Sequence, residues 1–154
     1  MKAVVLYFSH GGNTRAAARR IADIVGARQF EAVPAQAYPA DYKQLVARVL
    51  AQVKAGEHPP LIQMPDLADC DVLFAGSPNW CGAIAPPLAT ALSGADLSGK
   101  TVAPFFTHGG GGTGNMLQSL QAVCPGARIL PALSLKGSGT DGEVTAWLQE
   151  LGLQ

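Results

Sequence analysis

"YFSHGGNTRAAARRIA", residues Tyr7–Ala22, joins an apolar run to a helical pattern through a short polar loop. The apolar run, Lys2–Phe8, is rich in strand-forming residues, and the alanines and isoleucines beyond the loop recur at helical spacing. A strand that turns through two glycines directly into a helix is typical of the start of a β–α–β unit. The polar loop Ser9–Thr14 is therefore expected at the carboxyl end of the first strand, where such folds bind ligands.

The rest of the chain repeats this alternation of strand and helix. Further strands are predicted over Arg28–Pro34, Asp71–Ser77, Thr101–Thr107 and Arg128–Leu135. Helices are predicted over Asp41–Ala55, Pro86–Leu92, Asn115–Val123 and Asp141–Leu151, the last capped by Thr140 or Asp141. Pro104 and Pro131 interrupt two of the strands. The alternation predicts an α/β fold, a doubly wound five-stranded parallel sheet with helices on both faces.

Length and composition exclude several classes of protein. The 154 residues have the length of one domain, and no linker or repeat divides residues 1–154. The formal net charge is zero, which argues against nucleic acid or an anionic membrane as a partner. No stretch approaches membrane-spanning length, and the short apolar N-terminus lacks the pattern of a signal peptide. Three widely spaced cysteines, Cys70, Cys81 and Cys124, fit neither a zinc pattern nor a disulfide framework, so we expect a cytoplasmic protein without a metal site.

The first loop, Ser9–Thr14, has the composition of a phosphate cradle. Its two glycines let the backbone turn sharply, its side chains offer hydroxyl and amide donors, and the helix N-terminus behind it adds partial positive charge. The loop lacks a Walker lysine and phosphatase-type cysteine and arginine, which argues against those two classes of enzyme. The alternative is an ordinary strand-to-helix turn capped by Asn13.

Three arginines, Arg15, Arg19 and Arg20, follow this loop at once. Cations near a helix N-terminus oppose the helix dipole, and the spacing of Arg15 and Arg19 is mildly repulsive. We expect a bound dianion to relieve this repulsion; the alternative places the arginines on a solvated helix face.

The second loop, Gly76–Leu88, carries Trp80 at the ligand-side end of the third predicted strand. A tryptophan here is expected to be poorly placed for the core and well placed to stack on a planar ring. The alternative is a tryptophan packed on the prolines of its own loop. Trp147, by contrast, has the helical spacing of a core residue.

The third loop, Thr107–Asn115, contains four successive glycines. It matches G-x-G-x-x-G formally, but it follows the fourth predicted strand and has no acidic residue about 20 positions on, so we do not interpret it as a dinucleotide fingerprint. The glycines allow close backbone approach to a flat ligand. His108 either hydrogen-bonds that ligand or shuttles a proton, or is an ordinary surface histidine; His10 is interpreted as positional and His58 as a plain loop residue.

Together the three loops resemble those of the flavodoxin family over nearly the whole chain. "SHGGNT" is similar to the family's FMN phosphate loop, with Gly11 where a threonine is usual; "SPNWCG" resembles the loop that packs an aromatic side chain on the isoalloxazine ring; "THGG" resembles the loop at the pyrimidine end. The resemblance implies strand order 2-1-3-4-5 and cofactor contacts at Ser9, His10, Gly11, Gly12, Asn13, Thr14, Pro78, Asn79, Trp80, Cys81, Gly82, Thr107, His108, Gly109 and Gly110.

The resemblance further implies an FMN-binding electron-transfer protein whose partners are a separate reductase and an acceptor. No side chain need act as an acid or base, because the cofactor supplies the chemistry. The alternative is an FMN-dependent NAD(P)H:quinone-type oxidoreductase, favoured by an open flavin face, by His108 and by the lack of acidic carrier charge. A third interpretation, a thiol enzyme that uses Cys81 and His108, has nothing in the sequence to orient the histidine.

Overall fold

The computed structural model describes residues 1–154 and has one parallel sheet at its centre. The strands are β1 (Ala3–Tyr7), β2 (Arg28–Glu31), β3 (Val72–Pro78), β4 (Thr101–His108), β5 (Arg128–Ile129) and β6 (Leu133–Lys136). Their order is β2-β1-β3-β4-β5, with β6 also paired to β4. This confirms the predicted α/β fold and its strand order. The carboxyl ends of β1, β3 and β4 therefore lie side by side.

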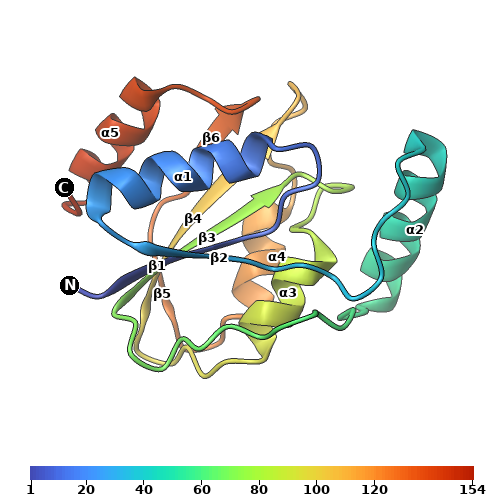
Figure 1. The fold of residues 1–154 in the computed structure, drawn as a ribbon, viewed down its shortest axis with the longest axis horizontal. Helices are drawn as coiled ribbons and strands as arrows, with labels where there is room; N and C mark the ends of the chain where they lie inside the picture. Colours follow the sequence, from blue (N-terminus) through green and yellow to red (C-terminus); the bar gives the residue numbers. More distant parts are fainter.

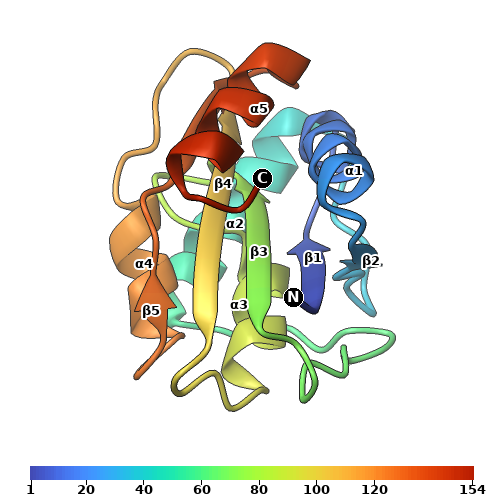
Figure 2. The same ribbon diagram turned by 90° about the vertical axis from the view of Figure 1, so that its left-hand side faces the viewer.

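Helices cover both faces of the sheet (Figures 1 and 2). They are α1 (Asn13–Val25), α2 (Tyr42–Ala55), α3 (Pro86–Ser93), α4 (Met116–Ala122) and α5 (Asp141–Glu150). The apolar faces of α1 and α5 pack on one side of the sheet, and those of α3 and α4 on the other. Helix α2 stands apart, at the end of the sheet to which the strands point (Figure 1), and Val49 is its only buried residue. None of the five helices combines the length and apolarity that crossing a bilayer requires.

The predicted strand Arg128–Leu135 is divided in two, and its break lies opposite a proline of β4. β5 pairs with the start of β4 and β6 with its end, which leaves Pro104 without a ladder partner on that side. A proline has no amide to donate, so a central strand tolerates one where the neighbouring strand is interrupted. The carbonyl of Pro131, inside the break, accepts a hydrogen bond of 2.9 Å from Nε1 of Trp147. Trp147 is buried, as its spacing predicted.

Candidate functional site

The loops after β1, β3 and β4 surround one cavity of about 180 Å³. It is lined by 11 residues, all predicted as cofactor contacts: Ser9, His10, Gly11, Asn13, Thr14, Pro78, Asn79, Trp80, Thr107, His108 and Gly109. The other four predicted residues lie outside this lining. Gly12 precedes α1, Cys81 lines a neighbouring hollow, and Gly82 and Gly110 lie within their loops. No carboxylate lines the cavity.

The first loop is folded around the hydroxyl of Ser9. Oγ of Ser9 accepts hydrogen bonds from the amides of Gly12 and Arg15, at 3.2 and 3.3 Å. Gly12 is the residue before α1 and has φ 98°, a left-handed conformation that glycine adopts at little cost. The N-cap residue is Gly12, which has no side chain to cap the helix, and Asn13 is already inside α1, so the alternative in which Asn13 caps the helix is wrong. Ser9 accepts from the amide of Arg15, whereas the amides of Asn13 and Thr14 have no acceptor within the chain and are left to bind a ligand.

A buried pair of hydroxyls lies at the base of the cavity. Oγ1 of Thr14 and Oγ1 of Thr107 are 2.8 Å apart, and both residues are only 2 % exposed. One hydroxyl hydrogen bridges the pair, so the hydrogen of the accepting hydroxyl has no acceptor within the chain. The hydroxyl of Ser9 also accepts without donating to any chain group. The cavity therefore presents hydroxyl hydrogens that no group of the chain accepts.

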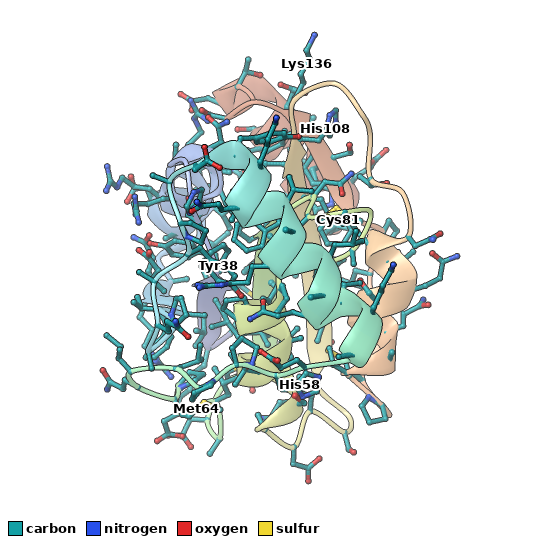
Figure 3. All side chains as sticks on the ribbon, turned by 90° about the vertical axis from the view of Figure 1, so that its right-hand side faces the viewer. Tyr38, His58, Met64, Cys81, His108 and Lys136 are labelled. Atoms are coloured by element: carbon teal, nitrogen blue, oxygen red, sulfur yellow. The ribbon has the colours of Figure 1, made fainter.

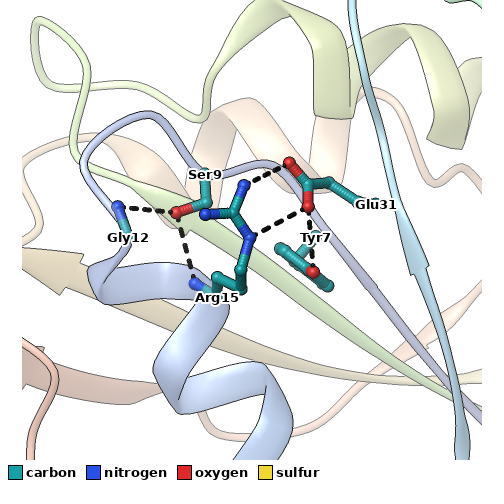
Figure 4. A network of polar contacts seen from close by, with 5 residues as sticks. All are labelled: Tyr7, Ser9, Gly12, Arg15 and Glu31. Atoms are coloured by element: carbon teal, nitrogen blue, oxygen red, sulfur yellow. Dashed lines mark hydrogen bonds and ion pairs between the residues drawn. The ribbon is translucent and has the colours of Figure 1, made fainter.

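Two of the three arginines after the loop form ion pairs with carboxylates of this chain. Arg15 donates to both carboxylate oxygens of Glu31, which also accepts from the hydroxyl of Tyr7 (Figure 4). Arg20 forms an ion pair of 2.7 Å with Asp141, at the start of α5, while Arg19 is exposed. Two of the three arginines therefore have carboxylate partners from distant elements before any ligand is bound, and relief of their repulsion by a bound dianion stays a prediction. The hydrogen bond to Glu31 raises the pKa of Arg15, and burial raises that of Tyr7.

Trp80 is buried, contrary to the expectation that its position excludes it from the core. It is 9 % exposed and makes edge-to-face contacts with Phe8 and Tyr38, with ring centroids 4.8 Å apart in both cases. His10 makes a third edge-to-face contact with Trp80, with ring centroids 5.7 Å apart. Trp80 nevertheless lines the cavity, so one part of the indole is shared between core and site. Stacking of a ligand ring on it stays a prediction.

A second, apolar hollow of about 280 Å³ adjoins the cavity and shares Asn79 and Trp80 with it. Its other walls come mainly from α2: Tyr42, Leu45, Val46 and Val49, with Cys81 opposite. Figure 3 shows α2 in front of the sheet, with Tyr38 and Cys81 to either side of it in that view. These α2 residues were not predicted from the sequence as neighbours of the site. The available signal was the helical spacing of these apolar residues, which begins with an aromatic one, Tyr42, at the start of the helix.

Cys81 is carried outward by a tight turn. The amides and carbonyls of Trp80 and Ala83 bond to each other, and the two residues between them, Cys81 and Gly82, have φ 56° and 80°. Positive φ at both central residues is typical of a type I′ turn. Cys81 is the only non-glycine residue of the chain with positive φ, and it is the one exposed cysteine.

His108 is engaged through both ring nitrogens. Its Nδ1 accepts from the amides of Gly110 and Gly112, at 3.0 and 3.3 Å, and its Nε2 lies 3.1 Å from Oγ of Ser134. Because Nδ1 accepts from amides, the proton belongs on Nε2. In this arrangement neither nitrogen is free for a ligand or a proton relay. No contact joins His108 to Cys81, which lines the other hollow, so the geometry gives no support to a thiol enzyme.

Comparison with known proteins agrees with this arrangement of loops. A family model described as flavodoxin matches residues 2–151. The chain belongs to the flavodoxin family. No curated protein sequence matches it.

Three solved structures show how closely this flavodoxin-family chain follows known folds. A protein from Bacteroides eggerthii assigned as a flavoprotein has 28 % identity and a TM-score of 0.88, with 99 % of each chain covered. A flavoprotein from Lactobacillus acidophilus, solved in complex with FMN, has 24 % identity and a TM-score of 0.77, with 95 % of this chain and 97 % of the other covered. A flavodoxin from the domain Archaea has 18 % identity and a TM-score of 0.62, with 99 % and 94 % covered.

Proposed function

We propose that this flavodoxin-family chain is an FMN-binding electron-transfer protein. FMN is the cofactor that family membership supports, and a similar flavoprotein was solved in complex with it. The observation that carries the proposal is the donor-rich cavity. Hydroxyl hydrogens from the Ser9 and Thr14–Thr107 groups lack chain acceptors, and the cavity is also lined by Asn13 and Thr14, whose amides have no acceptor within the chain. A phosphate group supplies acceptor oxygens and negative charge for such donors.

The residues present fit the rest of the cofactor as well. Ser9–Thr14 would hold the phosphate, and the segments Pro78–Gly82 and Thr107–Gly110 would border the ring system, with Trp80 along one face. FMN, when bound, supplies one-electron and two-electron chemistry. The chain itself binds the group, orients it and limits its contact with water. Electrons then pass between a separate reductase and an acceptor protein.

Titration of the cofactor-free protein with FMN and with riboflavin tests the phosphate assignment. Charge-assisted hydrogen bonds are worth about 1.5–3 kcal/mol each, so FMN should bind more than about tenfold tighter than riboflavin. Equal affinity for the two flavins would contradict the assignment of Ser9–Thr14 as the phosphate-binding loop. Binding is followed by the quenching of flavin fluorescence.

The second candidate is an FMN-dependent NAD(P)H:quinone-type oxidoreductase. The observation in its favour is the apolar hollow between α2 and Trp80, which offers room for a second flat molecule next to the cavity. Stopped-flow mixing of the FMN-loaded protein with NADPH separates the two candidates. A carrier should be reduced slowly by NADPH alone and fast once a flavodoxin reductase is added. Saturable bleaching of the flavin within seconds, with steady turnover on a quinone, would establish the reductase instead.

A further inference from the structure

The side chain of Asn79 joins two loops of the candidate site. Its Oδ1 accepts from the amide of Gly82 at 2.8 Å, within its own loop. Its Nδ2 donates to the carbonyl of Gly112 at 2.7 Å, in the glycine loop after β4. Its backbone amide also donates to the carbonyl of Thr107 at 2.8 Å. An asparagine thus uses one acceptor and one donor of the same planar amide to connect the segments that border the proposed ring site.

The glycine loop has few other means of support. A β-carbon added at Gly109, Gly111 or Gly112 would meet nothing within 4 Å, so this part of the loop is not packed against other groups. Gly112 is held by its amide, which donates to Nδ1 of His108, and by its carbonyl, which accepts from Asn79. Glycine backbones lose the most conformational freedom on ordering, so these two polar anchors set where the loop rests.

The same two loops touch at a second point. The amide of Asn115 donates to the carbonyl of Gly82 at 2.8 Å. A β-carbon at Gly114, which has φ 50°, would lie 3.1 Å from Cα of Gly82, closer than normal packing allows. The backbones are therefore in direct contact here. Asn79 fixes one end of the inter-loop space and the Gly82–Asn115 contact fixes the other.

We propose that Asn79 is a positioning residue that presets the separation of the two loops for the flat ring of a flavin. The proposal rests on the proposed FMN function. It assigns to the Asn79 side chain an indirect role: the amide is consumed by Gly82 and Gly112, and it acts on the ring through the loops it holds. If the separation of the two loops is already fixed in the cofactor-free protein, binding of the ring does not have to order the glycine backbone. The entropic cost of that ordering then does not reduce the affinity for the ring.

Three variants test whether the side chain of Asn79 holds the two loops at a fixed separation. Asn79→Asp keeps the acceptor for Gly82 but places an oxygen against the carbonyl of Gly112. Asn79→Ser replaces the amide with a hydroxyl that can still accept in the turn, adds no charge and is too short to reach Gly112. Asn115→Asp is the matched control, because it adds the same charge nearby, its side chain makes no hydrogen bond, and aspartate is equally suited to the position before α4. Deuterium uptake of residues 108–116 is measured in the cofactor-free proteins, and riboflavin, which has no phosphate, serves as the ring probe.

Both Asn79 variants should take up deuterium faster over residues 108–116 and bind riboflavin about tenfold more weakly, whereas Asn115→Asp should match the wild type. Unchanged uptake in the Asn79 variants would show that the Asn79 side chain does not hold the glycine loop. Faster uptake with unchanged riboflavin affinity would overturn its role in ring binding. If the wild type binds no flavin at all, the proposed function fails and the positioning role fails with it, whereas the exchange data still decide whether Asn79 holds the loop. Unfolding midpoints identify any variant that is globally destabilised.

Discussion

Arg15 donates to both carboxylate oxygens of Glu31, with nitrogen–oxygen distances of 2.7 and 3.1 Å. Glu31 shares a hollow with Ser9 and His10, so its negative charge lies near the proposed phosphate site. The pair therefore neutralises a charge that would oppose an anion there. We therefore expect Arg15 to take an indirect part in anion binding, through Glu31, that its position in the sequence did not indicate.

Arg15→Met should weaken FMN by about fivefold, since an unpaired carboxylate near the phosphate costs about 1 kcal/mol. Riboflavin should be little affected, because it has no phosphate. Adding Glu31→Gln to this variant should restore most of the FMN affinity. Calorimetric titration of the single and double variants measures the effect. A double variant that stays as weak as Arg15→Met would show that Arg15 meets the phosphate directly.

Thr14→Val should weaken FMN by about tenfold or more and leave riboflavin nearly unchanged. The substitution keeps the shape of the side chain and removes the hydroxyl that pairs with Thr107. A hydrogen bond to a charged group contributes about 1.5–3 kcal/mol. Thr113→Val, in the third loop and outside the cavity lining, is the control for a lost threonine hydroxyl. Equal loss of both flavins would place Thr14 at the ring instead of the phosphate.

Trp80→Ala should destabilise the cofactor-free protein by about 3–5 kcal/mol, the usual cost of removing a buried tryptophan. The indole packs against Phe8 and Tyr38, so the loss is structural before any flavin is bound. Trp80→Phe, which keeps an aromatic ring, should fold more stably and still weaken FMN and riboflavin by similar factors. Urea unfolding gives the stability and fluorescence titration the affinities. Unchanged flavin affinity in Trp80→Phe, with quenching as strong as in the wild type, would count against stacking.

Cys81 should be the single thiol that reacts with Ellman's reagent in the folded protein at pH 8. Cys70 and Cys124 are buried, and burial raises the pKa of both thiols, that of Cys124 to about 11. FMN should slow the reaction, because Cys81 follows Trp80 in the loop assigned to the ring. Cys81→Ser should abolish fast labelling, and labelling in denaturant should reveal all three thiols. A rate that is independent of FMN would place the ring away from this turn.

The stability of the fold should decline as the pH rises from 10 toward 12. Burial raises the pKa of Tyr38 from 10.0 to about 12. The folded state therefore holds the phenolic proton more tightly than the unfolded state, so this contribution is complete below pH 10 and is lost as the pH approaches 12. Tyr38→Phe should show a shallower decline in urea midpoints than the wild type over this interval. The remaining decline would include Tyr7 and Cys124, whose pKa values burial also raises. Equal slopes in the two proteins would contradict the prediction.

The fold could be predicted from the sequence because each strand and helix has its own periodicity, and alternation leaves few arrangements of a parallel sheet. The three loops could be located because the carboxyl ends of parallel strands meet at one edge. The turn at Asn79 was also accessible in principle, since asparagine at the first position and glycine at the fourth are favoured in a β-turn.

Contacts between distant segments were beyond the sequence patterns. The Arg15–Glu31 pair joins α1 to the end of β2, and nothing in the spacing of charges predicts it. The burial of Trp80 depends on Tyr38, in a segment without regular structure. The break between β5 and β6 could be suspected from Pro131, but its alignment with Pro104 depends on strand register. All three follow from tertiary packing, which local propensity does not encode.

The broken outer strand also bears on how copies of this chain behave toward one another. A long, bare strand edge is a template on which a second molecule can add its own strand. Here the edge consists of a two-residue and a four-residue piece, with the charged side chains of Arg128 and Lys136 exposed. Between them Pro131 has no amide to offer, and its carbonyl is already bonded to Trp147. These features disfavour edge-to-edge pairing of two copies on this side of the sheet.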